Sequence, residues 1–186
     1  MKQLLTIIVL AAILWTGFSY LNQQFNASTV RQVSANPDLT IDGQPVTAVY
    51  AFTNARVIDG DSVRVSDANS GDLDLRLAAI DAPELQQAFG ADAKQHLQQL
   101  LGNREIIAWE VGTDRYSRRL VFLFFEKPDG NLFEINAQMI ADGFAWHYGQ
   151  HSSNQILRSM EEQARSSRLG LWNDPGALPP WEFRQQ

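Results

Sequence analysis

The chain opens with a long apolar run, followed by a polar stretch and then by short hydrophobic segments separated by turns. No charged residue occurs between Leu4 and Leu21. A helix of about 18 residues spans roughly 27 Å, which is close to the thickness of a bilayer core. The pattern therefore predicts an N-terminal hydrophobic helix at residues 1–21, with Lys2 on its short side.

Three interpretations of this helix stay open: an uncleaved membrane anchor, a cleaved signal peptide and a buried soluble helix. Signal peptides have a shorter apolar core, about 7–15 residues, with a small-residue cleavage site just beyond it. Residues 22–25 make a poor cleavage site, and the best small-residue site, Val33-Ser34-Ala35, lies far downstream. Both an anchor and a signal peptide predict an extracytoplasmic protein. An anchor would keep it on the membrane, and a cleaved signal peptide would make it secreted or periplasmic.

The segments after the helix predict one folded domain between a linker and a tail. Residues 22–47 are polar and show neither helical nor strand periodicity, which is typical of a linker. Residues 48–174 carry the short hydrophobic segments of a domain, and residues 175–186 form a proline-rich tail that we expect to be irregular.

The predicted domain contains strands first and helices later. Strands are expected at 49–58, 62–65, 73–80, 105–111 and 120–125, and helices at 88–101, 134–142 and 153–167. Asp59-Gly60 predicts a hairpin turn, because aspartate and glycine accept positive φ. Short antiparallel strands with an inserted helix favour a closed barrel over a parallel sheet. We predict a mainly β, α+β fold: a five-stranded oligonucleotide/oligosaccharide-binding (OB) barrel with three helices.

Composition narrows the possible functions. The chain has 186 residues, enough for one domain and an appendage. Its net charge of −6 opposes a broad basic surface for gripping DNA, although a local arginine cluster remains possible. The absence of cysteine excludes disulfides and cysteine-based zinc sites.

The segment from Arg76 to Glu84 holds the main candidate chemistry. An apolar run ends in Asp81-Ala82-Pro83-Glu84, and Pro83 must end the strand because it has no N–H to donate to a sheet. Asp81 and Glu84 are therefore expected at the rim of the sheet. Carboxylates held close together repel unless a cation or a proton lies between them. The segment predicts part of a metal and phosphate site.

Two further turns carry charged groups: Asp59-Gly60-Asp61 and Asp114-Arg115-Tyr116-Ser117-Arg118. Taken singly, each of the three segments has an ordinary structural explanation, such as a hairpin turn, a helix cap or a solvated turn. Their combination is more informative. Residues 57–63, 76–84 and 113–118 occur in the order and spacing of the staphylococcal (micrococcal) nuclease or thermonuclease-like family. The chain resembles this family over residues 50–175.

The resemblance implies a role for each charged residue. Asp61 and Asp81 match the carboxylate ligands of a catalytic Ca²⁺ ion, and Ala82 matches a residue that supplies a backbone carbonyl. An oxygen-rich site of this kind also accepts manganese or magnesium. Glu84 matches the general base that acts on the attacking water.

The same resemblance assigns the substrate contacts. Arg76 and Arg118 match the arginines that bind the scissile phosphate, and Arg115 and Tyr116 match positions near a nucleotide phosphate. A guanidinium pairs two phosphoryl oxygens at once and stabilises the charge that develops there. Ser117 stands where the family usually has glycine. If that position needs positive φ, serine costs about 1 kcal/mol.

The implied function is a calcium-dependent endonuclease that hydrolyses DNA and RNA and leaves 3′-phosphates. The expected partners are nucleic acid and, if the N-terminal helix is uncleaved, a membrane; no protein partner is inferred. One alternative is a catalytically silent OB barrel that binds nucleic acid or protein, and another is a membrane-tethered structural protein. Retention of all five charged residues, Asp61, Arg76, Asp81, Glu84 and Arg118, favours the enzyme.

Overall fold

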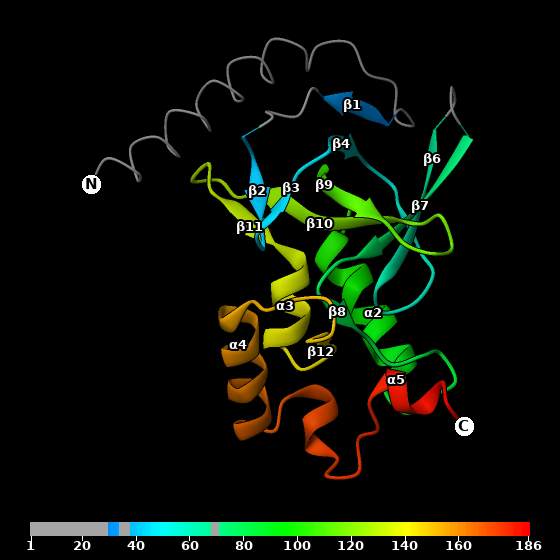
Figure 1. Cartoon of the computed structure of the whole chain (residues 1–186), viewed down its shortest axis with the longest axis vertical. Helices are drawn as coiled ribbons and strands as arrows, with labels where there is room; N and C mark the ends of the chain where they lie inside the picture. Colours follow the sequence, from blue (N-terminus) through cyan, green and yellow to red (C-terminus); the bar gives the residue numbers. More distant parts are fainter. Residues whose placement is uncertain (1–29, 34–37, 68–70) are drawn as a thin grey trace.

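The computed structural model describes residues 30–33, 38–67 and 71–186 (Figure 1). The predicted hydrophobic helix at residues 1–21 lies outside the described residues. Within the part of the chain that the structure describes, no helix is both long and apolar enough to cross a membrane. The anchor, the signal peptide and the extracytoplasmic location therefore stay predictions.

The main sheet is curled, because the strand at one end follows closely in the chain after the second strand from the other end. Its strand order is β1 (Arg31–Val33), β4 (Ala48–Phe52), β9 (Ile106–Thr113), β10 (Arg119–Glu126), β7 (Gly71–Leu77), β6 (Ser62–Asp67) and β5 (Arg56–Val57). Only residues 53–55 separate β4 from β5, so these two strands lie close together and the sheet curls into a barrel. β10 and β7 pair in parallel, whereas the other neighbours along this path are antiparallel.

The barrel interior follows the alternation that the sequence predicts for half-buried strands. Val63 and Val65 on β6 and Leu75 and Leu77 on β7 are each 1% exposed. In contrast, Val121, Phe122 and Leu123 of β10 are all buried, because β10 also contacts a helix, α3 (Ile135–Ala141), outside the barrel. Asn136 of this helix accepts a hydrogen bond from the Leu123 amide, which ties the helix to the sheet.

The three predicted helices are confirmed, with bounds within two residues of those expected. They are α2 (Gly90–Leu101), α3 and α4 (Gln155–Ser166). Gly102 and Gly143 follow the first two with φ of 52° and 76°, the left-handed region in which glycine ends helices. Asn154 caps α4 by accepting from two backbone amides. The tail is less irregular than expected, because a short helix, α5 (Pro180–Phe183), follows the 3-10 helix η1 (Gly170–Asn173).

The mixed α and β class is confirmed, but the predicted count of five strands is not. Short additional strands are present: β1, β2 (Thr40–Ile41), β3 (Gln44–Pro45), β8 (Ile80–Asp81), β11 (Leu132–Glu134) and β12 (Trp146–His147). β2 and β3 form a hairpin inside the predicted linker, and the next residue, Val46, is only 4% exposed. Part of that segment therefore packs against the domain, while the domain boundaries themselves stay predictions.

The turn at Asp59-Gly60 joins the antiparallel strands β5 and β6, as predicted, but for a different reason. Neither residue has positive φ. Glycine is required for space instead: a Cβ atom on Gly60 would lie 2.6 Å from Cβ of Ala82 and 2.8 Å from Cβ of Ala93. The turn therefore rests directly on the segment after β8 and on the first turn of α2. This close approach brings Asp61 next to Asp81.

Candidate functional site

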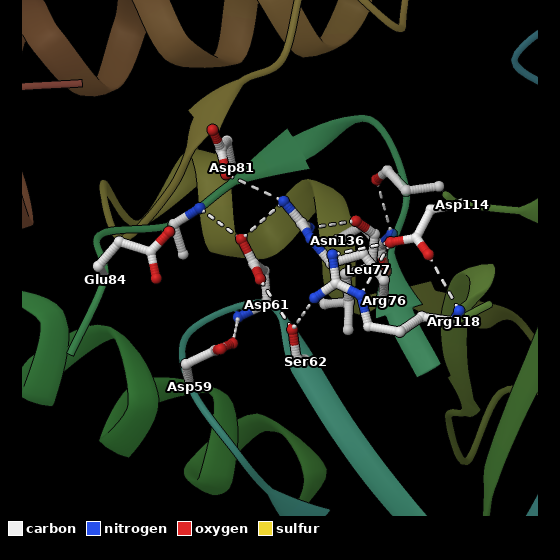
Figure 2. A network of polar contacts seen from close by, with 12 residues as sticks. Asp59, Asp61, Ser62, Arg76, Leu77, Asp81, Glu84, Asp114, Arg118 and Asn136 are labelled. Carbon is white, nitrogen blue, oxygen red and sulfur yellow. Dashed lines mark hydrogen bonds and ion pairs between the residues drawn. The ribbon is translucent and has the colours of Figure 1, made fainter. Parts of the chain in front are cut away.

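Three segments that are distant in sequence meet at one edge of the barrel (Figure 2). Asp61 immediately precedes β6, Arg76 lies near the end of β7, and Asp81 ends β8. The β6–β7 register places Ser62 opposite Arg76, and the Leu77 amide donates to the Asp61 carbonyl at 2.8 Å. On the other side, β8 pairs with β12, with Asp81 opposite Trp146. Regular sheet pairing thus fixes the backbone of the site.

Arg76 lies at the centre of the site and contacts both aspartates. Its Nη2 is 3.0 Å from Oδ2 of Asp61 and 2.9 Å from Oδ1 of Asp81. Its Nη1 donates to the Leu77 carbonyl at 2.7 Å, which fixes the plane of the guanidinium. The Asp81 side chain is only 1% exposed. The predicted convergence of Asp61, Arg76 and Asp81 is therefore observed.

Arg118 reaches the same site from the turn before β10. Its Nε and Nη2 both donate to Oδ2 of Asp114 at 2.8 Å. Its Nη1 is 3.4 Å from the Ser62 hydroxyl, which in turn donates to Oδ1 of Asp61 at 3.1 Å. A continuous polar network thus connects Arg118 through Ser62 to Asp61 and Arg76, as Figure 2 shows.

The turn that carries Arg118 has the strain expected for serine at position 117. Ser117 has φ of 64°, so the condition attached to the predicted cost is met. Asp114 holds the turn together, because its Oδ1 accepts from the amides of Tyr116 and Arg118. Burial raises the pKa of Asp114, but the hydrogen bonds from Arg118 and Tyr116 outweigh it, and the net shift is downward.

Arg115 and Tyr116 lie at the rim of the site rather than inside it. Tyr116 is 65% exposed. The Arg115 guanidinium lies 4.8 Å from the centroid of the Tyr116 ring, and the Arg118 guanidinium lies 5.7 Å from the same centroid. An exposed ring between two guanidinium groups presents an apolar face beside positive charge.

Ala82 and Glu84 follow Asp81 on the rigid segment that Pro83 defines. The Ala82 amide donates to Oδ2 of Asp61 at 2.7 Å, which ties the segment to the hairpin turn. The Glu84 amide donates to Oε1 of Gln87 at 2.8 Å. Unlike the two aspartates, the Glu84 side chain is 33% exposed. Water therefore reaches Glu84 but is nearly excluded from Asp81.

Sequence reasoning missed one charged residue of the site, Arg184. Its Nη2 lies 2.7 Å from Oδ2 of Asp81, and its Nη1 lies 2.8 Å from Oε1 of Glu84. Pro180 at the first position of α5 is a recognisable signal for a short helix. No local pattern, however, connects Arg184 with acids about one hundred residues earlier.

The donor set of the site fits a divalent cation. Burial, followed by the nearby Asp59 and Asp81, raises the pKa of Asp61 to about 7, even though Arg76 acts in the opposite direction. Asp61 and Asp81 contact the same Arg76 nitrogen, so the two carboxylates lie within reach of a single cation. Among residues 30–33, 38–67 and 71–186, no three His, Cys, Asp or Glu side chains converge as a metal site. A cation at Asp61 and Asp81 would therefore need carbonyl and water oxygens as well, which calcium accepts.

Comparisons with known proteins found a matching family and several similar sequences. Residues 74–174 match the family described as staphylococcal nuclease homologue, a range that includes Arg76, Asp81, Glu84 and Arg118. The chain is 40% identical over 148 residues to a micrococcal nuclease of Shigella flexneri, covering 76% of this chain and 84% of the relative.

Two further bacterial relatives are similar over most of their length. Protein ParB of Escherichia coli is 38% identical over 138 residues, which cover 70% of this chain and 77% of the relative. An uncharacterized endonuclease of Haemophilus influenzae is 34% identical over 131 residues, which cover 70% of this chain and 71% of the relative.

Proposed function

The chain belongs to the staphylococcal nuclease homologue family, and from this premise we propose that it is a calcium-dependent endonuclease that hydrolyses phosphodiester bonds of DNA and RNA. The observation that carries the proposal is the shared contact of Arg76 with Asp61 and Asp81, beside Arg118. Two buried acids and two guanidinium groups at one edge of a barrel are more than packing requires. The proposal includes assignment of the barrel to the OB type, with nucleic acid as its partner.

We assign the cation to the two buried aspartates. Asp61 and Asp81 would hold it through carboxylate oxygens, with the Ala82 carbonyl as a third protein ligand. When bound, a divalent cation offsets the negative charge that grows on the phosphoryl oxygens. The convergence of the two nearly buried aspartate side chains on one Arg76 nitrogen supports this assignment.

Arg76 and Arg118 are assigned to the scissile phosphate. Each guanidinium carries a permanent positive charge and directs two N–H groups to one side, so it pairs well with two phosphoryl oxygens. Asp114 and the Leu77 carbonyl hold these two side chains in place before substrate arrives. Preorganised donors of this kind lower the barrier because they need no rearrangement during the reaction. We assign Arg115 and Tyr116 to the adjacent nucleotide phosphate.

Glu84 is assigned as the general base. Its carboxylate is partly exposed, so it accepts a proton from a water molecule as that water attacks phosphorus. The new P–O bond forms as the bond from phosphorus to the 5′ oxygen breaks. The departing 5′ oxygen takes a proton from solvent, so the products are a 3′-phosphate and a 5′-hydroxyl. Extracytoplasmic location and membrane attachment through residues 1–21 are part of the proposal and rest on the sequence alone.

The test is a digestion assay with the full chain purified in a mild detergent. We expect cleavage of single- and double-stranded DNA and of RNA with calcium, and no cleavage with a chelator. Products should resist extension by a polymerase until a phosphatase removes the 3′-phosphate. Arg118→Ala and Glu84→Gln should each reduce the rate by about 10²–10³-fold, the usual loss for a preorganised donor or a general base.

Arg64→Ala is a matched control for Arg118→Ala. Arg64 lies on β6 and pairs at the surface with Asp74, so its loss removes the same charge without entering the site. Cleavage that is unchanged in Arg118→Ala and Glu84→Gln would refute the assigned roles. Binding of nucleic acid without any cleavage in calcium, manganese or magnesium would support the silent barrel instead.

A further inference from the structure

The C-terminal segment places a positive charge on the acids that are proposed to hold the cation. Arg184 Nη2 donates to Oδ2 of Asp81 at 2.7 Å, and Nη1 donates to Oδ1 of Asp81 at 3.2 Å. The same Nη1 also donates to Oε1 of Glu84 at 2.8 Å. One guanidinium therefore binds both oxygens of Asp81 and bridges to Glu84.

Contacts other than these ion pairs hold the segment against the domain. Trp181 of α5 stacks on Tyr148, with ring centroids 5.6 Å apart and an interplanar angle of 16°, and it meets Trp146 edge-on at 6.4 Å. Gln87 donates from Nε2 to the Leu178 carbonyl at 3.0 Å. In Figure 1, α5 lies beside the segment between β8 and α2. Residues 178–186, which we call the C-terminal latch, are thus docked where Arg184 reaches the site.

The latch and a cation need the same oxygen atoms. Oδ1 of Asp81 accepts from Arg76 and Arg184, and Oδ2 accepts from Arg184. The Asp81 side chain is 1% exposed, so little of it remains for a further ligand. A cation that takes an Asp81 oxygen must weaken or displace Arg184, because both are positive and both occupy the same lone pairs.

Arg184 also differs from Arg76 in how it is held. The Arg184 side chain is 42% exposed and follows the short helix α5 outside the sheet, whereas the Arg76 side chain is 11% exposed and belongs to a central strand of the barrel. Of the two guanidinium groups on Asp81, Arg184 is the one that moves away without disturbing the sheet.

We propose that the C-terminal latch is a built-in competitor of the divalent cation: Arg184 neutralises Asp81 and Glu84 in the metal-free protein and leaves when the cation binds. This inference rests on the proposed function, because it requires a cation site at Asp81. The latch keeps the acids paired, and it frees Glu84 only when the cation is present.

The test measures calcium binding to the full chain in detergent without nucleic acid, by titration calorimetry. Arg184→Ala should bind calcium about tenfold more tightly than the unaltered chain, a coupling of ordinary size between two linked sites. Trp181→Ala, which loosens the latch without removing a charge, should shift the affinity in the same direction. Arg158→Ala removes a surface arginine of α4 that pairs only loosely with Glu162, and it should leave the affinity unchanged.

Hydrogen exchange supplies a second readout. Calcium should speed amide exchange in residues 180–186 of the unaltered chain, because the latch leaves the site. Calcium affinity that is equal or weaker in Arg184→Ala overturns the latch. If Asp81→Asn abolishes calcium binding while Arg184→Ala leaves it unchanged, only the latch fails. If the unaltered chain and Arg184→Ala both bind no calcium, the cation site and the latch fail together.

Discussion

Two clusters of this molecule contain a buried acid and an arginine, and they differ in how the charges balance. In the first, Glu110 on β9 accepts from Arg119 at 2.8 Å and from the Tyr50 hydroxyl at 2.7 Å. Arg119 also donates to the Tyr50 hydroxyl. One carboxylate thus meets one guanidinium and one neutral donor. Burial, and then the neighbouring Glu110, raises the pKa of Tyr50 to about 12, so the hydroxyl stays a donor.

The second cluster is the candidate site, where two acids contact one arginine of the sheet. Asp61 and Asp81 share a single nitrogen of Arg76. Arg184 brings a second positive charge to Asp81. The Glu110 cluster is complete within the sheet and holds its strands together. In the candidate site, Asp81 also pairs with Arg184, which lies outside the sheet. What distinguishes this site is therefore not burial alone but two acids that share one arginine of the sheet.

The largest effect on activity and stability is expected from removing Arg76, which both aspartates share. Arg76→Ala leaves two acids near each other without their common partner, which should reduce the digestion rate by about 10³-fold and the free energy of unfolding by about 3–5 kcal/mol. Arg119→Ala is the matched change in the other cluster. It should lower stability by about 1–3 kcal/mol and keep the digestion rate of the folded protein. Equal loss of digestion rate in both variants would show that the two clusters do not differ in function.

Neutralising one acid in each cluster should change stability in opposite directions. Glu110→Gln weakens the pairing with Arg119 and should destabilise the fold by about 1–3 kcal/mol. Asp61→Asn relieves crowding among acids and should stabilise the metal-free fold by about 1–2 kcal/mol, as is common when a functional residue is removed. Urea unfolding in a chelator measures both. Destabilisation by Asp61→Asn would show that the site is already balanced without a cation.

Another acid, the half-buried Glu134, sharpens the comparison through its pH dependence. Burial, and secondarily the nearby Asp42, raises the pKa of Glu134 from 4.5 to about 7. The folded protein then binds more protons than the unfolded chain across this window. Stability is therefore highest below pH 4.5 for this group and falls as the pH rises toward about 7. The loss should be about 1–2 kcal/mol, allowing for partial exposure of the group.

Unfolding in urea at several pH values in a chelator measures this slope. Glu134→Gln should remove the contribution, whereas Glu105→Gln, which replaces another acid whose pKa burial raises, should leave most of it in place. A slope that is identical in the unaltered chain and Glu134→Gln would place the titration elsewhere.

The smallest effect is expected at Ser117, where the backbone rather than charge is strained. Ser117→Gly should stabilise the fold by about 1 kcal/mol, because glycine adopts positive φ without penalty. Ser117→Ala keeps the strain and is the control. A thermal melt would detect the shift. If glycine gives no gain over alanine, other interactions offset the backbone strain at Ser117, such as the hydrogen bonds to Asp114.

The sequence predicted what depends on local rules and missed what depends on contacts across the fold. The alternating strands, the helices and the rigid segment at Pro83 follow from neighbouring residues. The convergence of Asp61, Arg76 and Asp81 was instead expected from the resemblance to a known family. The role of Gly60 was assigned to φ, because nothing near it in sequence announces Ala82 and Ala93. Arg184 was missed for the same reason, since its partners Asp81 and Glu84 are far away along the chain.

Gly60 lies so close to Ala82 and Ala93 that a larger side chain at position 60 does not fit. Three residues with almost no side chain meet there, one each from the hairpin turn, the segment after β8 and the first turn of α2. An added methyl group on Gly60 would push the turn that leads into Asp61 away from the segment that follows Asp81. Bulk alone would therefore change the spacing of the two aspartates, with every charge of the site left in place.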